Sequence, residues 1–213
     1  MQATQSEVKP PLINIQYLSK IFNKYTYHIT LKDVEKTPNN VIKAGIPLQT
    51  RLLKPEDIEE YLQVKESNKK SPVMKRLKMG YVCWCAFHNQ EIMAYVWRGT
   101  NKVYVKELKT SIKLPEGYYY ACEAYTRPEY RGMGVFKELL TSWNIYAKNN
   151  YEYKKSIAIV HPDNEPAIRG ALATGQEIIG SIETRIFLGV PIHKAYGNDG
   201  YEELINQIFI EKT

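Results

Sequence analysis

The clearest hydrophobic pattern in the chain is an apolar strand that is followed by a turn and an amphipathic helix. Residues 118–126 are almost entirely apolar or aromatic, which is typical of a largely buried strand. Pro128 and Glu129 then suit a turn. Apolar positions after the turn recur at helical spacing, and they are Val135, Phe136, Leu139, Leu140, Trp143, Tyr146 and Ala147. The pattern therefore predicts a strand, a tight turn and a helix in that order.

Alternating strands and helices are predicted on both sides of this unit. Before it, we expect strands at 25–31, 47–53, 81–87 and 91–98, helices at 13–23 and 54–62, a polar basic connection at 66–78, and a strand or loop at 102–114. After it, we expect a strand at 155–160, a turn at 161–166, a helix at 167–173, a strand or hairpin at 178–188 and an amphipathic segment at 202–209. Helices that separate groups of strands predict an α/β (α+β) layered fold.

The turn before the long helix is suited to binding an anion. Gly132 and Gly134 permit positive φ angles and a close approach of the backbone to a ligand. A helix that begins at such a turn presents amide N–H groups without intrahelical partners, and its dipole adds positive potential. The phosphate-loop pattern GxxxxGK[ST] is absent, and GxGxxG fails because Lys137 occupies the third glycine position. A tight connection without a ligand is the alternative explanation of the two glycines.

The residues around this turn resemble motif A of the GNAT superfamily of acetyl-CoA-dependent N-acyltransferases. That motif reads Arg/Gln-x-x-Gly-x-Gly/Ala and is commonly preceded by Pro-Glu-Tyr, which stands here at residues 128–130. Arg131 and Gly134 match the motif, whereas Phe136 replaces its last small residue. The resemblance covers about residues 47–190 and implies a mixed, mostly antiparallel central sheet with helices on both faces. The residues that it implies for binding acetyl-CoA are Ala124, Tyr125, Thr126, Arg131, Gly132, Met133, Gly134, Val135, Phe136 and Asn164.

A second match follows the next predicted strand. GNAT domains often carry Asn-x-x-Ala-x-x-x-Tyr-x-x-x-Gly-Phe there, and Asn164, Ala167 and Gly175 match in register. Ala171 and Gln176 stand where the tyrosine and the phenylalanine are usual. That tyrosine often protonates the departing thiolate, so another tyrosine or solvent is needed here, since a thiol has a pKa of about 8.5. Asn164 has two open roles, a cofactor contact or a cap of the following helix.

The reaction that the resemblance implies is direct attack of a primary amine on the acetyl thioester in a ternary complex. An alkyl ammonium has a pKa of about 10, so its neutral form costs about 4 kcal/mol at pH 7, and a general base can recover part of that cost. Glu123 is the candidate base, because it is the only acidic side chain in the strand. Its alternatives are an outward-facing charge or an ion pair with a lysine, and His161 is a second candidate near the cleft. Backbone amides of residues 124–126 are expected to stabilise the oxyanion.

Composition and charge exclude several other classes of protein. The chain has 213 residues without a run of about 18 apolar residues, and its polar first ten residues do not predict a signal peptide. Cys83, Cys85 and Cys122 lie in apolar strand-like segments, which predicts reduced thiols in a cytoplasmic protein and no metal site. The net charge of +6 is expected to attract CoA phosphates rather than nucleic acid, because the lysines are scattered and no nucleic-acid motif is present.

Two regions are expected along the chain. Residues 1–45 are predicted to be an N-terminal extension, partly disordered with a possible helix and strand, and 46–213 a GNAT-like acyltransferase domain. The extension is expected to add a strand, a homodimer contact or a wall for the substrate. A small-molecule or peptide amine is the expected acceptor, and the basic residues within 69–78 favour a carboxylate or phosphate on it unless they form only a solvated loop. The alternative function is a GNAT-like module that binds CoA or another ligand without turnover, which Phe136 and Ala171 favour.

Overall fold

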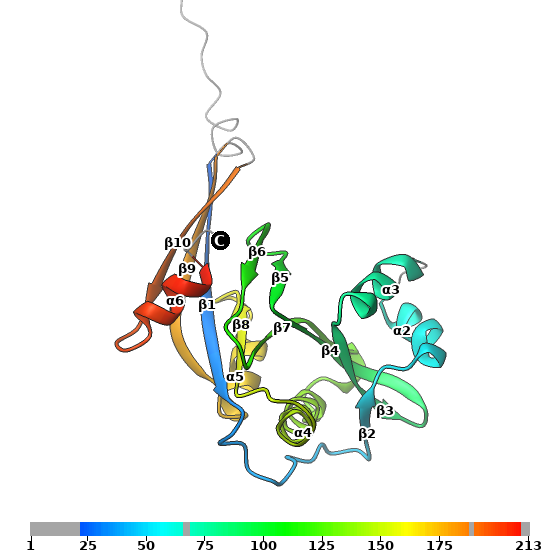
Figure 1. Cartoon of the computed structure of the whole chain (residues 1–213). Coiled ribbons are helices and arrows are strands. Elements are labelled where there is room, and N and C mark those ends of the chain that lie inside the picture. Colours follow the sequence, from blue (N-terminus) through cyan, green and yellow to red (C-terminus); the bar gives the residue numbers. More distant parts are fainter. Residues whose placement is uncertain (1–21, 66–68, 188–189, 210–213) are drawn as a thin grey trace, which may run out of the picture.

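The computed structural model describes residues 22–65, 69–187 and 190–209 (Figure 1). Within these residues, eight strands form one sheet in the order β10-β9-β1-β8-β7-β4-β3-β2, while β5 and β6 form a separate two-stranded sheet. The strands are β1 (Phe22–Asp33), β2 (Gln49–Leu52), β3 (Val82–His88), β4 (Glu91–Thr100), β5 (Lys102–Val105), β6 (Thr110–Lys113), β7 (Tyr118–Thr126), β8 (Lys155–Val160), β9 (Glu177–Phe187) and β10 (Val190–Gly197). The helices are η1 (Pro55–Asp57), α2 (Ile58–Val64), α3 (Lys70–Lys78), η2 (Pro128–Tyr130), α4 (Val135–Asn150), α5 (Glu165–Ala173) and α6 (Glu202–Phe209).

The large sheet is mixed but mostly antiparallel, because β7 and β8 are its parallel pair and its other described ladders are antiparallel. One face is covered by α2, α3, α6 and the β5–β6 hairpin, whose apolar side chains share a buried cluster with Tyr95 and Trp97 of the sheet. On the other face, Leu139 and Trp143 of α4 pack against Trp84. This arrangement confirms the expected α/β (α+β) fold with helices on both faces.

Strand β1 lies in the interior of the large sheet rather than at an edge. It pairs antiparallel with β8 on one side and with β9 on the other, and its Ile29 and Leu31 are buried. The strand expected at 25–31 is therefore present and is longer than expected. Most of the helix expected at 13–23 falls outside the described residues, and its last two residues begin β1 instead. The division of the chain at residue 45 stays a prediction, although residues 22–33 share a sheet with the remainder.

The basic segment after α2 contains a helix that the sequence pattern did not indicate. Residues 70–78 form α3, with Val73 buried and Leu77 packed against the cluster of α2 and the sheet. These two residues are four apart and share one helix face, but the lysines around them obscure this apolar stripe. The expectation of a polar connection is wrong for these residues. No helix in the described part of the chain is long and apolar enough to cross a membrane.

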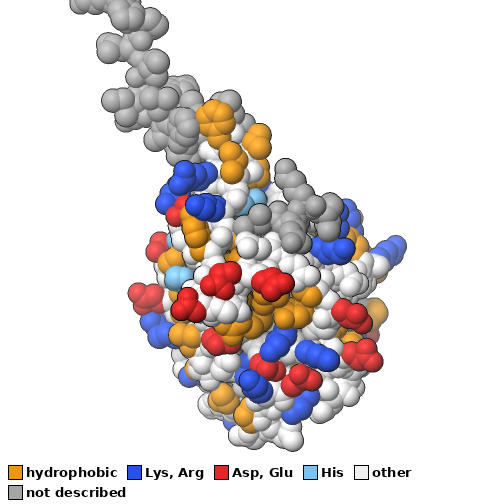
Figure 2. Space-filling view, turned by 60° about the vertical axis from the view of Figure 1, so that its left-hand side comes forward, with side chains coloured by type: hydrophobic (Ala, Val, Ile, Leu, Met, Phe, Trp, Pro, Cys, Tyr) orange, Lys and Arg blue, Asp and Glu red, His pale blue; other side chains and the backbone are white. Residues whose placement is uncertain are grey.

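The residues after α5 form a ribbon of two strands, which extends beyond the rest of the sheet together with the first residues of β1 (Figure 1). Strand β9 corresponds to the strand expected at 178–188, and β10 pairs with it, so the region is a hairpin. Val190 and Ile192 of β10 are exposed, as is Phe187 of β9, which pairs with Val190. Figure 2 shows apolar side chains gathered toward the end of this ribbon.

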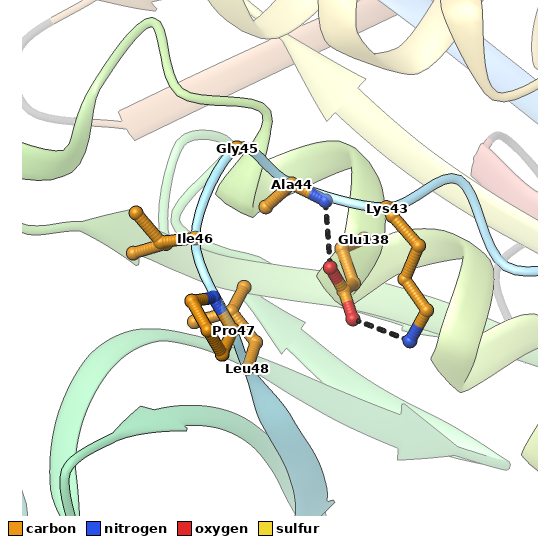
Figure 3. A pocket seen from close by; sticks show the side chains of 7 residues that line it. All are labelled: Lys43, Ala44, Gly45, Ile46, Pro47, Leu48 and Glu138. Atoms are coloured by element: carbon orange, nitrogen blue, oxygen red, sulfur yellow. Dashed lines mark hydrogen bonds and ion pairs between the residues drawn. The ribbon is translucent and has the colours of Figure 1, made fainter.

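The segment 42–46, here called the strap, crosses α4 near the start of that helix (Figure 3). Glu138 of α4 is almost fully buried beneath the strap, and its carboxylate accepts hydrogen bonds from Ala44 N at 2.7 Å and from Lys43 Nζ at 3.1 Å. A cavity of about 470 Å³ lies beside these contacts and is lined by Lys43, Ala44, Gly45, Ile46, Pro47, Leu48 and Glu138. The strap therefore fixes the first turns of α4 through one buried carboxylate.

Replacing Glu138 with alanine should destabilise the protein by about 1–3 kcal/mol, because the half-buried amide of Ala44 loses its acceptor. Urea denaturation measures this loss. The exposed Glu152, which is close to the other end of α4, provides the control, and Glu152→Ala should change stability by less than about 0.5 kcal/mol. Equal effects of the two substitutions would contradict a structural role of the strap.

Candidate functional site

The parallel strands β7 and β8 separate after a short stretch of pairing. Tyr118–Tyr120 of β7 pair with Lys155–Ile157 of β8. In the described structure, no later residues of the two strands pair with each other. Strand β7 stays paired with β4 up to Thr126. Beyond Tyr120, the edge of β7 that faces β8 therefore has no strand partner, and its backbone polar groups are available to a ligand. Consistent with this opening, Ala124 is exposed although it lies in an interior strand.

A β-bulge lies in β7 at the point where the two strands have separated. Val96 of β4 pairs with Ala124 and the next residue, Trp97, pairs with Cys122, which leaves Glu123 as the extra residue. Glu123 has a φ of +28°, an uncommon value for a residue with a side chain. Bulges re-aim side chains and often occur next to functional sites. Here the bulge directs a carboxylate toward α2 and α3.

The carboxylate of Glu123 binds groups from three different elements. It forms ion pairs with Lys65 Nζ, directly after α2, and with Arg76 Nη1 of α3 at 2.7 Å. The hydroxyl of Tyr95 in β4 donates to the same carboxylate at 3.2 Å. Burial by itself would raise the pKa of Glu123, but the hydrogen bonds and charges of Lys65 and Arg76 outweigh it and hold the pKa below its usual value. Glu123 is therefore ionised at neutral pH.

Aromatic rings form the wall behind Glu123. Trp97 Nε1 donates to Tyr61 Oη at 2.8 Å, and the ring of Tyr95 stacks on that of Tyr125 with centroids 5.8 Å apart. Burial raises the pKa of both Tyr61 and Tyr95, and it raises the pKa of Cys122 to about 11. These phenols and this thiol are neutral at pH 7. Among the described residues of this cluster, the groups charged at pH 7 are therefore Glu123 and its two cationic partners.

The glycine turn lies directly after β7. Gly132 and Gly134 have φ angles of +80° and +82°, and Gly134 begins α4 without any side-chain cap. No described residue accepts a hydrogen bond from the backbone amides of residues 132–136. Arg131 Nε donates to the carbonyl oxygen of Thr126 at 3.1 Å, which holds the turn against the end of β7. The turn thus presents free amide donors at the positive end of a helix of 16 residues.

Two residues of the motif have side chains that point into protein rather than toward a ligand. Val135 is almost fully buried in the cluster between α4 and the sheet, so only its backbone is available to a cofactor. Phe136 lies against Gly170 of α5, where an added Cβ would come within 2.8 Å of the Phe136 ring. The phenylalanine therefore fills the space between α4 and α5, and the glycine opposite it provides the room.

The remaining sequence candidates lie around α5. Asn164 Oδ1 accepts from Ala167 N at 3.3 Å, which is the helix-cap role, and its contact to a cofactor stays a prediction. His161 packs its ring against Tyr27 with centroids 5.6 Å apart and does not belong to the Glu123 cluster. Ala171 is buried in α5 and offers no acid.

The structure brings most of the predicted cofactor residues to one end of the sheet. Residues 124–126 end β7, and residues 131–136 form the turn and the start of α4. The alternative of an ion pair between Glu123 and a lysine is present in the structure, and the lysine is Lys65. Sequence reasoning did not identify Tyr95 or Arg76 as partners of Glu123, although it considered Arg76 among the basic residues that favour an acidic acceptor or form a solvated loop. The spacing of Val73 and Leu77 was the one signal that places Arg76 on a packed helix.

Comparisons with known proteins place these features in a family. The model of the Acetyltransferase (GNAT) family matches residues 51–175, more than half of the chain. A tandem GNAT protein from the clavulanic acid biosynthesis pathway is 14% identical with a TM-score of 0.53, and the match covers 81% of this chain and 53% of that protein. A Drosophila protein is 11% identical with a TM-score of 0.55, and the match covers 81% of this chain and 55% of that protein.

A functionally unknown conserved protein from Staphylococcus epidermidis is 12% identical with a TM-score of 0.51, and the match covers 81% of this chain and 66% of that protein. The chain thus spans between about half and two thirds of the length of these three structures. At such identities the likeness shows the fold alone. No curated protein matches the chain.

The ion pairs of Glu123 should make its contribution to stability depend on pH. Because the folded pKa is lowered, the stabilisation is present above the ordinary pKa of about 4.3 and is lost as the pH falls through the folded value. The free energy of unfolding of the wild type should therefore exceed that of Glu123→Gln by about 1 kcal/mol at pH 7, and the difference should shrink toward pH 3. Thermal unfolding of both proteins across this range measures the difference. A difference that stays constant with pH would contradict the ion-paired state.

Proposed function

This chain belongs to the acetyltransferase (GNAT) family, and from that premise we propose that it moves an acetyl group from acetyl-CoA to a primary amine. The observation that carries this proposal is the coincidence of two features at one end of the sheet. The unpaired edge of β7 beyond Tyr120 is adjacent to the glycine turn, whose amides have no acceptor among the described residues. The bulge at Glu123 lies between the part of β7 that pairs with β8 and this turn. An extended ligand with an anionic end fits such an arrangement.

The free amides of residues 132–136 are proposed to bind the pyrophosphate of acetyl-CoA. Amide donors at a helix N-terminus suit phosphate groups, and no side chain of the turn competes for them. The edge of β7 at residues 124–126 is proposed to bind the pantetheine arm and to direct a backbone N–H toward the thioester carbonyl. A donor at that point would stabilise the negative charge that develops on the carbonyl oxygen.

The proposed transfer occurs in a single ternary complex. The amine nitrogen forms a bond to the acetyl carbon, the C–S bond breaks, and CoA leaves as a thiolate with the electron pair. The ammonium form of the acceptor must lose two protons in all, one before the attack and one from the new amide nitrogen. Ala171 stands where the family usually has its tyrosine, so solvent is proposed to protonate the thiolate, which has a pKa of about 8.5.

Glu123 is proposed to position the acceptor and to pass its first proton to solvent. Its ionised carboxylate can accept a hydrogen bond from an ammonium group, and its location at the bulge is directly beside Ala124. The lowered pKa makes Glu123 a weaker proton acceptor than an ordinary glutamate. We therefore expect the proton of the amine to pass to water rather than to remain on the carboxylate. The rate should then rise with pH as the amine loses its proton, so the pKa of the amine sets the ascending limb of the pH–rate profile.

A small-molecule or peptide amine is the proposed acceptor, and the cytoplasm is the proposed location. Free thiols support the second proposal, because the three cysteines form no disulfide in the described structure and reducing compartments maintain that state.

The phosphate-binding role of the turn can be tested with two variants of Gly132. A Cβ at this position meets no atom within 4 Å, so the turn has room for a side chain there. Among residues with a side chain, the φ of +80° favours asparagine and aspartate. Gly132→Asp should weaken CoA and acetyl-CoA binding about tenfold or more by charge repulsion, whereas Gly132→Asn should bind within about threefold of wild type. Calorimetric titration measures both. Equal affinities of the two variants would remove the turn from the phosphate site.

Glu123→Gln should lower kcat for acetyl transfer by about 10²-fold while leaving the Kd for CoA unchanged. The amide keeps the shape of the side chain but cannot accept a proton or neutralise an ammonium. Release of free CoA thiol, followed over time, measures the rate. Glu116→Gln is the matched control, because it removes an exposed carboxylate just before β7. Wild-type rates in Glu123→Gln would leave Glu123 with a structural role only.

A further inference from the structure

Among the described residues, the cluster of Glu123, Lys65 and Arg76 at the bulge carries an excess of one positive charge. The two oxygens of Glu123 accept from three donors, namely Lys65, Arg76 and Tyr95, and two of these donors carry a positive charge. The cluster is partly open to solvent, with exposed side-chain fractions of 35% for Lys65, 34% for Arg76 and 28% for Glu123. A cluster sealed in the core would be inaccessible, but this one can be reached by a small molecule. The excess of one positive charge in this cluster is therefore accessible to a ligand from solvent.

The two cations retain N–H donors for which the described residues provide no carboxylate other than Glu123. Arg76 spends one of its terminal nitrogens on Glu123, and its guanidinium carbon lies 5.2 Å from the ring centroid of Trp97, which limits its orientation. Across the described ranges, Glu123 is the only carboxylate that pairs with Arg76 or Lys65. A guanidinium offers five N–H donors in a planar fork that matches a carboxylate. The Arg76 guanidinium is thus held in one orientation and retains N–H donors that can bind a ligand.

The other acidic side chains of this region already have partners. Glu60 and Glu91 pair with Arg127, and Glu59 pairs with Lys70. Among the described residues, none of these carboxylates forms an ion pair with Arg76 or Lys65. The compensating negative charge is best supplied by the ligand.

We propose that the acceptor is an amino acid, a primary amine that carries its own carboxylate. This inference rests on the proposed acetyl transfer and specifies the class of amine. The carboxylate of the acceptor would bind Arg76 and Lys65, and its ammonium would bind Glu123. In the protein these opposite charges are neighbours, with 2.7 Å between Arg76 Nη1 and the Glu123 carboxylate, and an amino acid likewise holds its two charges only one or a few carbons apart.

The same arrangement disfavours polycationic acceptors. An amine with several ammonium groups would place a second positive charge near Arg76 and Lys65, which repels it. The acetyl step remains balanced for an amino acid. Its nitrogen loses one proton, bonds to the acetyl carbon as the C–S bond breaks, and then loses its second proton to solvent, while the carboxylate is unchanged.

The decisive experiment measures acetyl transfer by the full wild-type chain to matched sets of acceptors. Each set compares an amino acid with its amide and with the amine that lacks the carboxyl group, such as glycine, glycinamide and methylamine, or phenylalanine, phenylalaninamide and phenethylamine. An aminoglycoside serves as the polycationic acceptor. We expect kcat/KM to be at least about tenfold higher for the amino acid in the best set. An amide is less basic and has more neutral amine at pH 7, so this preference cannot come from intrinsic reactivity.

Equal or better transfer to the amide, the simple amine or the aminoglycoside would overturn the amino-acid proposal while leaving acetyl transfer intact. Absence of transfer to every acceptor, with acetyl-CoA still bound, would contradict both proposals. These two failures are therefore distinguishable within one experiment.

A variant locates the preference on Arg76. Arg76→Gln should raise KM for the amino acid about tenfold, while KM for the amide and the Kd for CoA stay within about twofold. Lys75→Gln is the control, because it removes a positive charge from the exposed side of the same helix. If Arg76→Gln lost activity equally toward the amino acid and its amide, Arg76 would not be the residue that binds the acceptor carboxylate. If Arg76→Gln does not fold, the acceptor sets with wild type decide the question alone.

Discussion

The short parallel ladder between β7 and β8 is the constraint on which the rest of the site depends. This ladder ends after Tyr120, while β7 stays paired with β4 for six more residues, up to Thr126. An interior strand normally satisfies its backbone on both edges, so this separation creates a row of free polar groups inside a protein. The bulge at Glu123, the exposed Ala124 and the glycine turn all follow the separation along the chain. Binding of an extended ligand would complete the hydrogen bonds that β8 leaves open.

The two sides of β7 have different electrostatic character. On the α4 side, free amides and a helix dipole provide positive potential, and the Glu138 carboxylate in the first turn is bound by Lys43 and the amide of Ala44. On the α2 and α3 side, an ion-paired carboxylate lies against neutral phenols and a neutral thiol. The first environment suits phosphate and the second suits a small molecule that carries both signs of charge. One strand thus separates the cofactor side from the acceptor side.

Local sequence patterns predicted the elements that depend on short-range chemistry. The bounds of β7, β8 and α6 coincide with the expected segments, because apolar runs and amphipathic spacing are clear there. Helix α3 was missed because Val73 and Leu77 are its only well-packed apolar residues among lysines. The position of β1 between β8 and β9 depends on pairs such as His28 with Val160, and no local pattern encodes such long-range pairing. The bulge likewise depends on the register between β4 and β7, so the partners of Glu123 could not be foreseen.

The central claim is that acetyl-CoA binds along the open edge of β7 and the turn that begins α4. Hydrogen–deuterium exchange of the full chain, with and without acetyl-CoA, tests it directly, because the amides that contact the ligand are the ones that should slow. The account predicts slower exchange at residues 121–126 and 131–137, with the β9–β10 ribbon unchanged. Protection confined to other segments, such as the strap at 42–46 with its neighbouring cavity, would contradict it, as would an absence of protection at saturating ligand.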